Sequence, residues 1–196
     1  MKKILVSIFA LVLGVQAFGQ AVPFLNIPTN AEQLGLAGAS VSNYVAGKGD
    51  IRFTYGSWAP KSVGTSIISA DAAFKFGKIG FSIEGKFFND QAVKLYSETG
   101  ASAGTFTPKE MYFGAGFSYW IADAFNIGVK GRFVSSSIYK NTSASAFAAD
   151  VEFKYVKNAF AAGVAVCNIG SKVKYGSAGT ENKLPSLLKF GAQYKA

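Results

Sequence analysis

Few residues in this sequence can carry acid–base or metal chemistry. The 196 residues include no His and a single Cys, Cys167. Without His there is no imidazole base, no Ser–His nucleophile pair and no imidazole metal ligand. One Cys excludes a disulfide framework and a Cys-rich zinc or iron–sulfur site. The remaining Ser, Asp and Glu residues show no catalytic spacing. We therefore expect no enzyme, no metal site and no cofactor, and we interpret Cys167 as a small buried side chain.

The charged side chains recur at alternating positions, with both signs mixed on one face of the predicted strands. Small residues such as Gly114 and Gly128 share this face, where they leave space for long paired side chains in a narrow interior. Unlike charges on adjacent strands can pair there, away from bulk water. We predict that these residues form a charge network in the lumen of a barrel: Asp71, Lys75, Glu84, Lys86, Lys130, Arg132, Asp150, Glu152 and Lys154. The last five are expected to form one network.

Strands with two unlike faces must position these charges. Apolar residues recur at every second position in eight segments, which is the period of a strand. In one of them Phe125, Ile127 and Val129 alternate with Asn126 and Lys130. Most segments are near the ~9–11 residues with which a tilted strand crosses a bilayer. The eight segments are 50–58, 66–76, 79–88, 111–120, 125–133, 147–155, 160–166 and 187–194.

The connections between these segments alternate between short and long. Tight turns are predicted at 77–78, 122–124 and 157–158, and longer polar loops at 59–65, 89–109, 140–145 and 170–186. Short turns at one end and long loops at the other are typical of a transmembrane β-barrel. We predict an all-β, antiparallel transmembrane barrel with about eight strands. Its long loops would face outward and its short turns would face the periplasm.

A soluble β-sandwich or lipocalin-like barrel would also alternate, with its apolar face inward. Charged residues make up only 16% of the chain, against about 25% in an ordinary soluble domain, and aromatic residues make up 15%. A solvated outer face would explain the charges of the polar face but not its many Gly and Ala residues. These observations favour the membrane barrel.

The N-terminus has the pattern of a secretory signal peptide. Lys2 and Lys3 precede an apolar stretch from Ile4 to Val15, and 17–19 supply small residues for cleavage before Gln20. We therefore divide the chain into a signal peptide (1–19), an N-terminal segment (20–49) and a barrel (50–196). The N-terminal segment opens with a Pro-bounded piece that we expect to be extended. Its Gly-rich remainder would form a first strand or lie inside the barrel.

Two stretches resemble a known family. They are PFLNIPTNAEQLGLAGASVS, beginning at Pro23, and AAGVAVCNIGSKVKYGSAGTENKLPSLLKFGAQYKA, beginning at Ala161. Both are similar to PorV/PorQ-type outer-membrane proteins of Bacteroidetes. The resemblance implies a FadL-like outer-membrane barrel and, as in some members, a role in type IX secretion. Two departures stand out: Trp58-Ala59-Pro60 replaces the usual Asn-Pro-Ala motif, and members are commonly longer. The resemblance therefore implies a short variant or part of a larger barrel.

Three functions follow as expectations. The first is a non-enzymatic outer-membrane barrel, whose partners would be outer-membrane lipid and secretion-system proteins or exported cargo. The second is a passive FadL-like transporter of a small apolar solute, which would need a continuous apolar pocket although the inward face is charged. The third is a small structural eight-stranded barrel. Nucleic acid is not an expected partner, because the chain is exported and its Lys residues are scattered.

Overall fold

The computed structural model describes residues 21–28, 49–57, 64–176 and 179–194. The predicted signal peptide and most of the predicted 20–49 segment therefore lie outside the described residues. No helix in the described ranges is long and apolar enough to cross a membrane. The elements are η1 (Pro23–Asn26), β1 (Gly49–Ser57), β2 (Ser66–Phe76), β3 (Ile79–Asn89), β4 (Val93–Tyr96), β5 (Ser102–Phe106), β6 (Lys109–Ala122), β7 (Phe125–Tyr139), β8 (Thr142–Lys157), β9 (Phe160–Gly170), β10 (Val173–Lys174), β11 (Glu181–Asn182) and β12 (Leu187–Tyr194).

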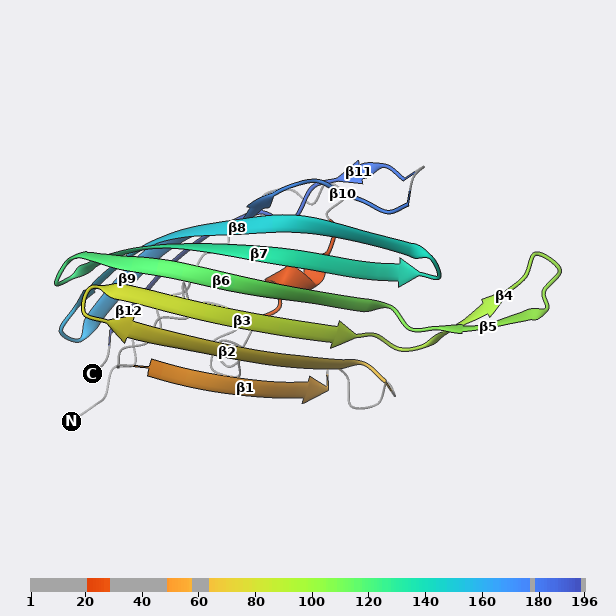
Figure 1. Cartoon of the computed structure of the whole chain (residues 1–196), viewed down its shortest axis with the longest axis horizontal. Coiled ribbons are helices and arrows are strands. Elements are labelled where there is room, and N and C mark those ends of the chain that lie inside the picture. Colours follow the sequence, from red (N-terminus) through yellow and green to blue (C-terminus); the bar gives the residue numbers. More distant parts are fainter. Residues whose placement is uncertain (1–20, 29–48, 58–63, 177–178, 195–196) are drawn as a thin grey trace, which may run out of the picture.

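Eight of the strands form one antiparallel sheet in the order β1-β2-β3-β6-β7-β8-β9-β12. The sheet curls so that β9 and β12 pass behind the front strands in Figure 1. Residues with positive φ close its tight turns: Gly77 between β2 and β3, and Asn158 between β8 and β9. Two small hairpins, β4–β5 and β10–β11, extend the connections at the opposite end. No ladder joins β1 to β12 within the described ranges, so both are edges of the sheet.

All eight predicted segments are strands of this sheet, which confirms the all-β, antiparallel prediction. The predicted loop at 140–145 is wrong, because only Lys140 and Asn141 lie between β7 and β8. Asn141 has a φ of 60° and permits a tight turn. The small polar residues that follow pair with β7, as Ser143 does with Ser137, because a paired strand satisfies their backbone groups as well as it does those of apolar residues. Short and long connections therefore do not alternate strictly.

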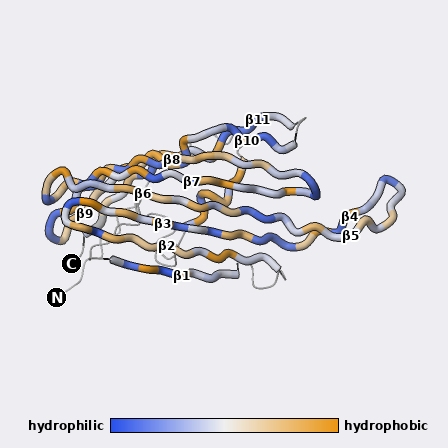
Figure 2. The backbone as a smooth tube through the Cα atoms, viewed as in Figure 1, coloured by the Kyte–Doolittle hydropathy of each residue, from blue (hydrophilic) through white to orange (hydrophobic). Residues whose placement is uncertain are grey.

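The sheet exposes its apolar face and buries its charged face. Phe53 is 72% exposed and Phe147 is 68% exposed, whereas Lys86 is 0% and Arg132 is 7% exposed. Figure 2 shows the resulting alternation of hydrophobic and hydrophilic residues along the strands. This arrangement is the reverse of a lipocalin-like barrel, and it is stable only where the surroundings of the outer face are apolar.

The apolar outer surface ends abruptly along β7 and β8. On β7 it runs from Phe125 to Phe133, and Ser135 then occupies the next outward position. On β8, Phe147 is followed toward the turn by Ser145, which pairs with Ser135. The apolar part of β7 is nine residues long, from 125 to 133, close to the ~9–11 residues of one bilayer crossing. The two strands continue beyond that band with mainly Ser, Thr and Ala residues, and β7 ends in the exposed Ile138 and Tyr139.

Candidate functional site: an inner-face charge network and N-terminal latch

Four charged side chains connect three strands on the inner face, the face that carries η1. Lys130 Nζ lies 2.8 Å from Glu84 Oε2, and Arg132 Nε lies 3.7 Å from Glu84 Oε1. Arg132 also donates a hydrogen bond to Asp150. Glu84 comes from β3, Lys130 and Arg132 from β7, and Asp150 from β8. Each carboxylate thus has a basic partner, as buried charges require.

Glycine makes this network geometrically possible. Glu84 pairs in register with Gly114 of β6, and Gly114 pairs with Arg132 of β7. A Cβ at Gly114 would lie 2.6 Å from Arg132 Cγ and 3.2 Å from Glu84 Cγ. Similarly, a Cβ at Gly128 would lie 2.7 Å from Glu152 Oε1. The missing side chains allow long charged groups to meet across an intervening strand.

The remaining predicted network residues have other partners. Glu152 and Lys154 pair with each other at 3.3 Å, closer to the tight-turn end of β8. Lys75 Nζ lies 4.4 Å from the centre of the Trp120 ring. Asp71 pairs at 2.6 Å with a residue that the sequence analysis did not select, Arg52 of β1. The sequence offered a sign of this residue, because Arg52 lies on the polar side of the 50–58 alternation. In the structure it lies directly opposite Asp71 in register.

The N-terminal segment covers part of the inner face. The prediction of an extended Pro-bounded piece is wrong, since Pro23–Asn26 is a 3₁₀ helix. Pro23 suits the first helical turn because it has no N–H to leave unbonded. Phe24 and Leu25 are buried in a hydrophobic cluster, and Phe24 packs on Tyr112 with ring centres 5.9 Å apart. Apolar burial therefore fixes η1 against the sheet.

Lys86 of β3 is the first polar anchor of this segment. Its Nζ donates hydrogen bonds to the carbonyl oxygens of Phe24, at 3.4 Å, and Ile27. The same ammonium lies 4.9 Å from the centre of the Tyr112 ring. Because carbonyl oxygens and an aromatic face both attract a cation, these contacts stabilise the buried Lys86 ammonium.

Asn168 of β9 is the second anchor, and a β-bulge directs it inward. Ala149 pairs with Ile169 and Val151 pairs with Val166, so Cys167 and Asn168 together face Asp150. Asn168 has a φ of 57°, and both bulge residues are buried. Asn168 N–H donates to Asp150 Oδ1 at 2.8 Å. The bulge therefore places a polar side chain where regular alternation would place an apolar one.

The Asn168 side chain joins two distant segments. Its Nδ2 donates to Asn26 Oδ1 at 2.9 Å and to Pro185 O at 3.0 Å. Ser186 Oγ donates back to Asn168 O at 2.8 Å. Leu184 belongs to the same buried cluster as Phe24. We call Lys86 and Asn168, with the contacts they make to 21–28, the latch.

Replacing Asn168 by Ala is expected to destabilise the protein by about 2–5 kcal/mol. The change leaves the buried carbonyl oxygen of Pro185 without its donor, at about 1–3 kcal/mol, and puts Ala in a left-handed conformation, at about 1–2 kcal/mol. Asn158→Ala is the matched control, because Asn158 has a φ of 54° but lies at the turn between β8 and β9. Urea unfolding in detergent measures the loss of stability in the two variants. Equal losses would show that the side-chain contacts of Asn168 contribute nothing.

In the part of the chain that the structure describes, no three His, Cys, Asp or Glu side chains gather as metal ligands would. The Asp and Glu side chains of the charge network instead pair with basic side chains.

An antiparallel sheet with an apolar exterior and a paired-charge interior defines the class of transmembrane β-barrel proteins. Within that class, the model of the family described as type IX secretion system protein PorV matches residues 77–196. The match covers more than half of the chain, and the chain belongs to this family. It includes the bulge and the Leu184-Pro185 segment. No curated protein that was compared with the chain matches it.

Proposed function

We propose that the chain is a non-enzymatic outer-membrane barrel that serves type IX secretion by presenting its loop end to secretion proteins or exported cargo. Residues 1–19 would direct export, and cleavage would leave Gln20 as the mature N-terminus. The observation that carries the proposal is the exposed apolar face, which is stable in a bilayer and unstable in water. Membership of a secretion-system family supports the partner class.

The inner face favours this function over passive transport of an apolar solute. Such a solute would need a continuous apolar path. The described inner face instead carries the Glu84-centred ion pairs, and η1 packs on its loop half beside Tyr112 and Val134. The latch holds η1 there by buried hydrogen bonds. These contacts give the segment a structural role that an open conduit would not need.

The loop end offers surfaces for partners. The β4–β5 hairpin projects beyond the main sheet in Figure 1. At its base, Phe106 contacts Tyr139 of β7, with ring centres 6.1 Å apart. The β10–β11 hairpin lies at the same end and carries the exposed ion pair of Lys172 with Glu181. Both hairpins extend beyond the apolar band.

Sidedness tests this proposal in intact cells. A membrane-impermeant maleimide should label Ala101→Cys, in the β4–β5 turn, and should label Asn158→Cys only after lysis. The native Cys167 is buried, so Cys167→Ser serves as the background. The reverse labelling pattern would invert the topology.

Fractionation and affinity purification test location and partners. The full chain should sediment with outer membranes, begin at Gln20 and retain secretion-system proteins after mild detergent extraction. A soluble cytoplasmic or periplasmic chain would overturn the proposed location. Outer-membrane chain that retains none of these proteins would overturn the secretion role alone.

A further inference from the structure

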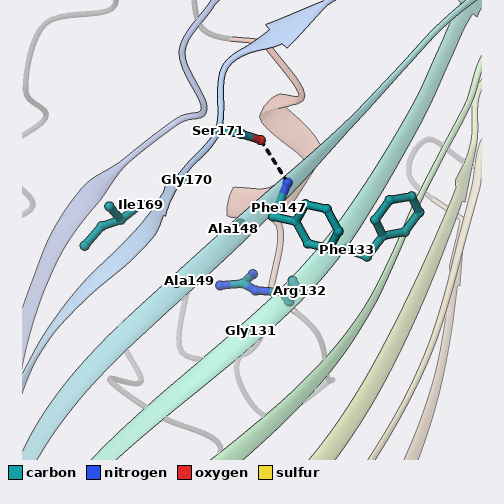
Figure 3. Close-up of a pocket in the computed structure, with 9 residues that line it drawn as sticks. All are labelled: Gly131, Arg132, Phe133, Phe147, Ala148, Ala149, Ile169, Gly170 and Ser171. Carbon is teal, nitrogen blue, oxygen red and sulfur yellow. Dashed lines mark hydrogen bonds between the residues drawn. The ribbon is translucent and has the colours of Figure 1, made fainter.

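The outer face contains an apolar hollow of about 500 Å³ where β7, β8 and β9 meet. Figure 3 shows its lining, with the Phe133 and Phe147 side chains beside each other and Ile169 across from them. We call this hollow the acyl slot. It is lined by Gly131, Arg132, Phe133, Phe147, Ala148, Ala149, Ile169, Gly170 and Ser171.

Small residues on the outward positions create the slot. A Cβ at Gly131 would meet nothing within 4 Å, so the space above β7 is open there. Ala149 pairs with Gly131 in register and extends the same low floor across β8. The rings of Phe133 and Phe147, with centres 5.4 Å apart, form a wall on the loop side. An open apolar hollow with two aromatic rings along one side can take an apolar chain.

The strands are joined where the slot meets the loop end. Ser171 N–H donates to Phe147 O at 3.0 Å, and Phe147 N–H donates to Ser171 Oγ at 3.0 Å. Arg132 approaches from the inner side but is engaged by Asp150 and Glu84. The two hydrogen bonds between Ser171 and Phe147 hold β8 against β9. The Arg132 guanidinium is already paired with carboxylates of the inner face. The slot therefore lies on the outer face of the sheet.

Positive charge lies directly beyond the slot. Ser171 is followed by Lys172 and Lys174, and Val173 between them is buried inward. Because side chains alternate along a strand, Lys174 points away from the inner cluster. Glu181 is the one carboxylate between 171 and 183, and the hydrogen bond from Lys172 holds its pKa below the usual value. With Lys183 included, this stretch carries a net positive charge.

The depth of the slot matches the boundary between acyl chains and head groups. Phe133 and Phe147 are the last apolar residues on their faces before Ser135 and Ser145. A chain lying in the slot would thus place its polar end near the lysines of 172–174. Lys172 is engaged by Glu181 at 2.7 Å, so Lys174 is the side chain placed to attract a phosphate at the membrane surface.

We propose that the acyl slot holds one acyl chain of an anionic phospholipid, whose phosphate lies at Lys174. The proposal rests on the proposed membrane location. It assigns the slot to a bound lipid of the loop-side leaflet and adds a specific lipid ligand to the proposed secretion barrel.

Native mass spectrometry of the full chain, refolded in detergent, tests whether the acyl slot binds lipid. The probes are dimyristoylphosphatidylglycerol, which is anionic, and dimyristoylphosphatidylcholine, which is neutral overall. We expect one tightly retained phosphatidylglycerol and weaker retention of phosphatidylcholine. Ala149→Phe should weaken phosphatidylglycerol binding about tenfold, because it displaces contact with about two methylenes. Val129→Phe, outside the slot lining, is the control and should leave binding unchanged.

A second pair of variants tests the head-group contact. Lys174→Gln should weaken phosphatidylglycerol binding about fivefold and leave phosphatidylcholine unchanged. Lys157→Gln, at the opposite end of β8, should change neither. Inorganic phosphate at millimolar concentration should not compete, since the acyl chain supplies the remaining contact. If inorganic phosphate alone displaced the bound lipid, the site would bind only an anion, and the proposal of the acyl slot would be overturned.

The outcomes separate this inference from the proposed function. Wild-type chain that does not insert into lipid vesicles would count against the membrane location itself. Inserted chain whose lipid binding is unaffected by Ala149→Phe would overturn the acyl slot alone. If Ala149→Phe does not fold, Gly131→Leu fills the same space from β7 and carries the same expectation.

Discussion

Val151→Lys is expected to lower the free energy of unfolding by about 2–4 kcal/mol, the cost of placing Lys near the midplane of a bilayer. Val151 lies at the centre of the apolar band of β8, is 44% exposed, and pairs with Val129 on β7. The large effect requires that this face contacts lipid. Urea unfolding of the chain inserted in vesicles gives the difference directly, and heat-modified mobility on gels reports whether the variant folds.

Lys130→Gln provides the inner-face comparison. It removes the 2.8 Å ion pair with Glu84, but Arg132 remains beside that carboxylate. The expected loss is therefore about 1 kcal/mol, because Gln still offers a hydrogen bond. If Val151→Lys inserts and unfolds like the parent while Lys130→Gln does not, the assignment of inside and outside is wrong.

Gly170→Ala is the second substitution with a large expected effect, about 3 kcal/mol or more. The new Cβ would collide with the carbonyl oxygen of Phe147 and would lie 3.0 Å from Ala148 Cα. Both are backbone atoms of a paired strand, so relief requires β9 to move away from β8. That movement would also weaken the hydrogen bond from Ser171 N–H to Phe147 O.

Gly131→Ala is the matched control for this glycine. A Cβ there meets nothing within 4 Å, so the expected change is within about 0.5 kcal/mol. Unfolding in urea measures the pair under the same conditions. Equal stabilities for the two variants would show that β8 and β9 do not approach as closely as the structure indicates.

Eight strands and their two faces were predictable from the alternation of residue types alone. Period-two alternation is local, so the apolar set of 125–133 identifies an outward face without any knowledge of its neighbours. Glycines on the charged side indicated a crowded interior, and the contacts of Gly114 show why. The prediction of a loop at 140–145 is wrong because the small polar residues there have the composition of a loop, whereas a tight turn at 140–141 lets them pair with β7.

The folded arrangement of the strands was needed to establish which charges meet and what residues 21–28 contact. Glu84 reaches Arg132 because β6 lies between their strands with Gly114 in the same register row, an arrangement that depends on three strands at once. Asn168 faces inward because one extra residue enters β9 opposite Asp150, and no local period signals a bulge. Its bond to Asn26 spans 142 positions of the chain. Contacts of that range are set by the curl of the whole sheet, because each requires the register of every strand between its partners.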